Sequence, residues 1–92
     1  MIQAHLFISG FVQGVGYRHF VRKNAQRFGL TGWVRNLPDN RVEAVLQGSK
    51  AQIEKLILLC RSKKGPFLAE IENIDIAWEE KKELFNDFEI VV

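Results

Sequence analysis

The sequence of 92 residues has one cysteine, two prolines and no long run of apolar side chains. The single cysteine, Cys60, excludes a disulfide within the chain, and its place on the apolar stripe of an expected helix predicts a buried, inert thiol. The first residues, MIQAHLFISG, lack the basic leader of a signal peptide, and no apolar segment approaches the length that crosses a membrane. We therefore expect a cytoplasmic chain with no membrane partner.

Length and charge narrow the class of protein. A chain of 92 residues with 47% hydrophobic side chains can bury one core and is too short for two, so residues 1–92 are expected to form one domain. The net charge is +2, and the basic side chains are spread over several elements without a run, which favours a solvated surface over a nucleic-acid partner. Residues 17–28 carry Arg18, Arg22, Lys23 and Arg27 and no acid, so an anionic small molecule near this segment would meet a favourable field.

The spacing of apolar residues predicts the element order βαββαβ followed by a short terminal strand. Strands are expected over 2–9, 31–37, 41–47, 70–79 and 88–92, and helices over 17–28 and from a cap at Ser49 to a stop at 63–66. Pro38, Asp39 and Asn40 form the turn between the second and third strands. This order is that of the split βαβ or ferredoxin-like fold, an α+β sandwich with two helices on one face of an antiparallel sheet.

Residues 10–18, GFVQGVGYR, join the first strand to the first helix. They hold three glycines in seven positions and no Ser, Thr, Asp or Asn that could cap the helix, so the first N–H groups of the helix need another acceptor. Glycines, converging N–H groups and the planar donor fork of Arg18 suit a phosphate or another tetrahedral anion. The alternative is a tight turn capped by water, with Arg18 in solvent.

Other known functions of glycine-rich loops fit poorly. The loop lacks the Gly-Lys-Ser/Thr ending of an ATPase, and the third glycine of a dinucleotide fingerprint would fall at His19. His19 itself points about 100° away from Arg18 on the helix and is expected at the surface.

His5 is out of phase with the apolar positions of its strand, so we expect it to be structural or exposed. The strand RVEAVLQG has no aromatic side chain on which RNA bases could stack.

Three segments together, GFVQGVGYR, GWVRN at 32–36 and RVEAVLQG at 41–48, resemble the acylphosphatase family over essentially the whole chain. The resemblance implies an enzyme that hydrolyses acyl phosphates to a carboxylate and inorganic phosphate. It also implies that Asn36 holds the attacking water and that the phosphate is held by Gln13, Gly14, Val15, Gly16, Tyr17 and Arg18. Where the family commonly has Asp-Gly in the hairpin turn, this chain has Asp39-Asn40, and Asn tolerates a positive φ next best after Gly.

The chemistry of an acyl phosphate suits a site with few reactive groups. Its leaving group is a carboxylate, which needs little protonation, so a general acid is dispensable. Around the loop and hairpin we expect no carboxylate pair, no metal cluster and no Ser–His couple, and therefore neither metal nor cofactor. The remaining groups can stabilise charge and position water, and a substrate oxygen then accepts the proton of the water.

The expected partners are therefore an acyl phosphate and inorganic phosphate, with no obligate protein partner. Two alternatives stay open. One is a non-catalytic domain that binds an anion or carbamoyl phosphate, as in the similar N-terminal domain of larger hydrogenase-maturation proteins. The other is a nucleic-acid-binding module of the same fold, whose binding would depend steeply on salt.

Overall fold

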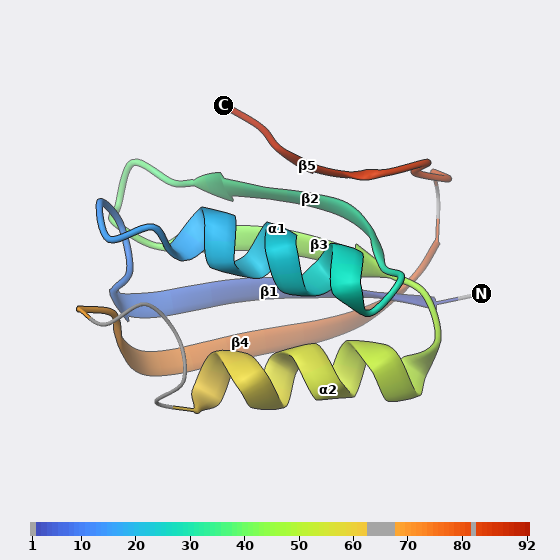
Figure 1. Ribbon diagram of the computed structural model, residues 1–92, viewed down its shortest axis with the longest axis horizontal. Coiled ribbons are helices and arrows are strands. Elements are labelled where there is room, and N and C mark those ends of the chain that lie inside the picture. The colour runs from blue at the N-terminus through green and yellow to red at the C-terminus, as the bar shows by residue number, and fades with distance from the viewer. Residues whose placement is uncertain (1, 63–67, 82) are drawn as a thin grey trace.

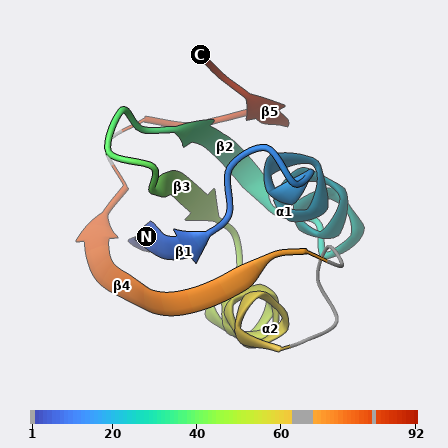
Figure 2. The ribbon, with the colours of Figure 1, turned by 90° about the vertical axis from the view of Figure 1, so that its left-hand side faces the viewer.

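The computed structural model describes residues 2–62, 68–81 and 83–92. In chain order these form β1 (Ile2–Phe11), α1 (Tyr17–Arg27), β2 (Thr31–Asn36), β3 (Val42–Gln47), α2 (Lys50–Arg61), β4 (Glu70–Glu80) and β5 (Phe88–Ile90). Both helices lie on one face of the sheet (Figures 1 and 2). The predicted ferredoxin-like sandwich is confirmed, while the predicted stop of α2 at 63–66 lies outside the described residues.

The sheet has the strand order β4-β1-β3-β2-β5. The pairs β1–β3, β1–β4 and β2–β3 are antiparallel, as expected. β5 instead runs parallel to β2, with Gly32 opposite Phe88 and Val34 opposite Ile90, so the sheet is mixed. The direction follows from the path of the chain, because β4 ends at the same end of the sheet at which β2 begins (Figure 1).

The core lies between the sheet and the helices. The alternation in β1 places Ala4, Leu6 and Ile8 toward the helices with no exposed surface. They meet the apolar stripes of α1 and α2, and burial of each such Leu or Ile side chain contributes about 1.5–3 kcal/mol to folding. No helix in the described part of the chain combines the length and apolarity that a membrane crossing requires.

Helix α2 begins as its sequence predicts. Ser49 is the N-cap, and its hydroxyl oxygen accepts a hydrogen bond from the Gln52 amide at 3.2 Å. The Gln52 side chain does not complete a capping box, since its buried Oε1 has no hydrogen-bond partner within residues 2–62, 68–81 and 83–92. One half of the expected cap is therefore formed.

The sheet face opposite the helices carries a charged cluster around Glu43. His5 Nε2 lies 2.6 Å from one Glu43 carboxylate oxygen, and Arg35 Nε donates to the other at 2.7 Å. Burial raises the pKa of Glu43, but the hydrogen bonds from His5 and Arg35 outweigh it and hold the pKa below its ordinary value. Of the two expectations for His5, structural or exposed, its contact with Glu43 favours the structural role.

Candidate active site

Two glycines shape the loop between β1 and α1. Gly14 has φ 75° and Gly16 has φ 81°, both in the left-handed region that L side chains rarely adopt. A Cβ placed on either glycine would meet nothing within 4 Å, so the backbone conformation and not a lack of space requires glycine here. The glycines at positions 14 and 16 are thus explained by two residues with a left-handed backbone conformation just before the helix.

The first turn of α1 has backbone donors without an acceptor in the helix. The first helical hydrogen bond runs from the Phe20 amide to the Gly16 carbonyl oxygen at 3.1 Å, so the N–H groups of Tyr17, Arg18 and His19 precede it. Gly16 is the N-cap and offers no side chain, and no acidic residue stands in the first turn. This end of the helix therefore presents N–H groups and a positive potential to the loop.

Arg18 adds a guanidinium at the same helix end. Its side chain is partly exposed, and it forms no ion pair with any residue that the structure describes. Its donors are thus available to a ligand. Val15, within the loop, instead packs against the core.

The side chain of Tyr17 lies in the core. It is 2% exposed, and its hydroxyl donates a hydrogen bond to the Cys60 carbonyl oxygen at 3.4 Å. Burial raises the pKa of Tyr17 far above its ordinary value, so the hydroxyl remains protonated. Tyr17 can therefore contribute its N–H group, and not its side chain, to a phosphate site. Cys60 is the predicted buried thiol, with a pKa that burial raises to about 11.

Gln13 connects the loop to the β2–β3 hairpin. Its Nε2 donates to the Leu37 carbonyl oxygen at 2.8 Å and to the Arg41 carbonyl oxygen at 2.9 Å. These two carbonyls stand on either side of the hairpin turn, and the views show that turn and loop lie at the same end of the molecule (Figures 1 and 2). This contact was not predicted from the sequence. The one signal for it was an amide side chain in a loop that is otherwise apolar or glycine.

Asn36 ends β2 at this same end of the sheet, opposite Val42. Its side-chain oxygen, Oδ1, is buried and has no hydrogen-bond partner among the residues that the structure describes. Buried polar atoms are nearly always hydrogen-bonded, so an unpaired acceptor here suits a water or a ligand. The turn that follows contains Asn40 with φ 73°, the conformation for which the sequence analysis compared Asn with Gly.

The loop and hairpin that form this site lie within a region that a family model recognises. The acylphosphatase model matches residues 4–90. The chain belongs to the acylphosphatase family. An acylphosphatase of Chloroflexus aurantiacus is 48% identical to it over 80 residues, which are 87% of this chain and 85% of the relative.

Solved structures of acylphosphatases and of a larger protein share the fold. The crystal structure of acylphosphatase from Bacillus subtilis matches with a TM-score of 0.93 at 32% identity, over 100% of both chains. Full-length HypF, in a phosphate- and nucleotide-bound form, matches with a TM-score of 0.83 at 35% identity; the match covers 100% of this chain and 12% of HypF. The acylphosphatase fold thus occurs both as a chain of this length and as a small part of a longer one.

Among residues 2–62, 68–81 and 83–92 of this acylphosphatase-family chain, no three His, Cys, Asp or Glu side chains are grouped to hold a metal ion. The groups that the structure brings to the loop and hairpin are backbone donors, a guanidinium and an amide. Such groups can bind an anion and orient a water molecule.

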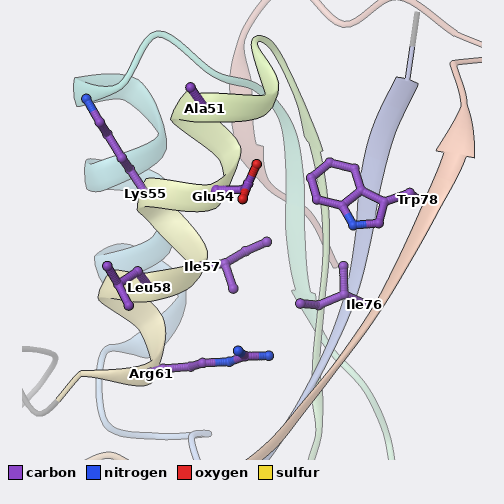
Figure 3. Close-up of a pocket in the computed structure, with 8 residues that line it drawn as sticks. All are labelled: Ala51, Glu54, Lys55, Ile57, Leu58, Arg61, Ile76 and Trp78. Atoms are coloured by element: carbon purple, nitrogen blue, oxygen red, sulfur yellow. The ribbon is translucent and has the colours of Figure 1, made fainter.

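A separate hollow lies between α2 and β4 (Figure 3). Its volume is about 450 Å³, and its lining is Ala51, Glu54, Lys55, Ile57, Leu58, Arg61, Ile76 and Trp78. Arg61, Glu54 and Ile57 extend from the helix toward the strand that bears Trp78 (Figure 3). None of the expected site residues lines this hollow.

Proposed function

We propose that this chain hydrolyses the carboxyl–phosphate bond of acyl phosphates and releases a carboxylate and inorganic phosphate. The observation that most supports this is the buried Oδ1 of Asn36, which has no hydrogen-bond partner in the described part of the chain. Asn36 precedes Leu37, to which the loop is hydrogen-bonded, and the helix after the loop begins with N–H groups that lack an acceptor within the helix. An acceptor left unpaired in the interior costs about 1–3 kcal/mol, and a bound water would remove that cost. An acceptor for water beside donors for phosphate is the minimum that a hydrolytic site needs.

The phosphate is proposed to sit in the loop of residues 13–18. The N–H groups at the start of α1 and the Arg18 guanidinium would surround its oxygens with donors. Gly14 and Gly16 turn the backbone so that the amides can converge, and their lack of side chains leaves the approach open. The same groups would bind the phosphate more strongly as charge grows on its oxygens in the transition state.

The water is proposed to be oriented by Asn36. Its oxygen attacks phosphorus, the bond from phosphorus to the acyl oxygen breaks, and the carboxylate leaves with the electron pair. The proton of the water goes to a phosphate oxygen, because a neutral amide accepts a hydrogen bond and not a proton. A carboxylate leaves without help from an acid, so the proposal requires no metal and no cofactor.

The proposal also includes a cytoplasmic location, which the unpaired thiol of Cys60 favours because reduced cysteines persist in that compartment. The proposed partners are the small acyl phosphate and inorganic phosphate.

The deciding experiment is hydrolysis of benzoyl phosphate by the purified chain, with phenyl phosphate as a control. Turnover of the first and not the second is expected, because phenoxide is a far poorer leaving group than benzoate. Exhaustive chelation should leave the rate unchanged. If phosphate binds but benzoyl phosphate is not turned over, the chain is a non-catalytic anion-binding domain and the proposed function is wrong.

A further inference from the structure

The side-chain nitrogen of Gln13 is hydrogen-bonded to the β2–β3 hairpin. Its two Nε2 hydrogens are donated to the carbonyl oxygens of Leu37 and Arg41, at 2.8 and 2.9 Å. The hairpin already closes on itself, because the Leu37 amide donates to the Arg41 carbonyl oxygen at 2.8 Å. Gln13 therefore adds bonds to a formed turn, and it joins segments that are 24 and 28 residues apart in the chain.

These bonds link the loop to the hairpin, the two segments that carry the candidate site. Gln13 stands directly before Gly14 and its left-handed turn, and Leu37 stands directly after Asn36. Since a glycine-rich backbone has many accessible conformations, the position of the loop relative to Asn36 depends on contacts outside the loop. The Gln13 side chain supplies two such contacts to the hairpin.

We propose that Gln13 is a positioning residue, whose side chain holds the phosphate loop at the distance from Asn36 that attack requires and makes no contact with phosphate. The inference rests on the proposed function, because it assigns the phosphate to the loop and the water to Asn36. A misplacement of about 1 Å between reacting groups can lower a rate by about 100-fold, so two hydrogen bonds at this junction are enough to matter.

The chemistry of the contact favours an amide. Two carbonyl oxygens face the side chain, so it must end in a group with two donor hydrogens. A carboxylate of the same shape would place acceptor against acceptor, and methionine keeps the length without donating. Gln13→Glu and Gln13→Met therefore break the contact in different ways while they preserve the volume of the side chain.

The first experiment compares steady-state kinetics of both variants with the wild type and with Gln26→Met, a matched change at an exposed position of α1. We expect kcat to fall about 10–100-fold in the Gln13 variants, with the inhibition constant of inorganic phosphate changed less than about threefold. Their melting temperature should lie below that of Gln26→Met, because two hydrogen bonds are lost, while the variants stay folded at the assay temperature. A phosphate inhibition constant that rises in step with the loss of kcat would make Gln13 a ligand and overturn the inference. An unchanged kcat would overturn it too.

A double-mutant cycle with Asn36→Ala tests the coupling. If Gln13 acts through Asn36, Gln13→Met should lower kcat less than about threefold further in the Asn36→Ala background. Losses that multiply would show that Gln13 acts independently of Asn36, against the inference.

The second experiment separates the inference from the proposed function, because it needs no turnover. Inorganic phosphate is titrated into ¹⁵N-labelled protein. In the wild type we expect shifts at the loop amides and also at the hairpin amides of 36–41, and in Gln13→Met at the loop alone. Hairpin shifts that persist in Gln13→Met, or that are absent from the wild type, overturn the inference. A wild type that couples loop and hairpin but fails to hydrolyse benzoyl phosphate overturns the proposed function, and Gln13 then joins the loop to the hairpin without a part in attack.

Discussion

The hydroxyl of Tyr17 donates a hydrogen bond to the carbonyl oxygen of Cys60 at 3.4 Å, and this contact joins the first residue of α1 to the last turn of α2. The free N–H groups of α1 therefore begin at a residue whose side chain is held in the core. Because burial raises the pKa of Tyr17 far above its ordinary value, the hydroxyl stays protonated and can donate at any pH at which the protein is assayed.

Tyr17→Phe keeps the ring in the core and removes only this hydrogen bond. We expect the free energy of unfolding to fall by about 0.5–1.5 kcal/mol. The kcat and the phosphate inhibition constant should stay within about threefold of the wild type, because only the backbone of Tyr17 faces the loop. Urea unfolding and benzoyl phosphate kinetics measure the two effects. A large loss of kcat without loss of stability would place the hydroxyl in the site.

Arg18→Lys should weaken phosphate binding and lower kcat, each by about tenfold or more, because an ammonium cannot replace a planar fork of donors. The matched control is Arg27→Lys at the other end of α1, where the guanidinium is exposed and lies 5.4 Å from the Phe28 ring centroid. The phosphate inhibition constant and kcat are measured for each of the two variants and compared between them. Equal effects would remove Arg18 from the proposed cradle.

Asn36→Ala should lower kcat by about 100-fold or more and leave phosphate affinity nearly unchanged, since the proposed work of this amide is to orient water. The fold should survive, because Asn36 Oδ1 has no hydrogen-bond partner to lose. The measurements are kcat, the phosphate inhibition constant and a thermal melt. A loss of phosphate affinity would move Asn36 to the cradle, and unchanged turnover would exclude it from the mechanism.

Gly16→Ala and Gly29→Ala form a matched pair, because both glycines have positive φ, 81° and 69°, and open space around the Cβ position. Each substitution should cost about 1–2 kcal/mol of stability through the left-handed backbone. Only Gly16→Ala should also raise the phosphate inhibition constant, since Gly29 lies past the other end of α1. Equal inhibition constants in the two variants would contradict a phosphate site at the loop.

Glu43 should contribute stability that depends on pH. Its pKa lies below the ordinary 4.5, so this stability is fully present above about pH 4.5 and is lost as the pH falls through the lowered value. Glu43→Gln should lower the free energy of unfolding by about 1–3 kcal/mol at pH 7, and the gap to the wild type should narrow below pH 4.5. Urea unfolding of the wild type and of Glu43→Gln at pH 7 and at pH 3.5 measures this difference in the free energy of unfolding. A gap that stays constant would show that the carboxylate charge is not the cause.

The sequence was sufficient for features that depend on near neighbours along the chain. Alternation in β1 and the apolar stripe of α2 follow from periods of 2 and 3.6 residues, and the Ser49 cap acts within one helical turn. The direction of β5 could not be predicted in this way, because a strand of three residues, Phe88–Ile90, has no internal signal for its neighbour.

Only part of the candidate site could be predicted from the residues themselves. The left-handed Gly14 and Gly16 and the uncapped start of α1 follow from the composition of the loop. Asn36 came from resemblance alone, because one amide at the end of a strand has no local signature of its own. The hydrogen bonds of Gln13 were missed because their partners are set by the tertiary fold, far away along the chain.

The place of β1 between β3 and β4 has a consequence for how the chain reaches its native state. β1 pairs only with segments that follow it, β3 on one side and β4 on the other, and its residue Ile2 lies opposite Glu80. A growing chain on the ribosome thus exposes Ala4, Leu6 and Ile8 until the partners have been made. Such distant contacts close long loops before they gain stability, so folding should be slow for a protein of this length and should follow synthesis of β4.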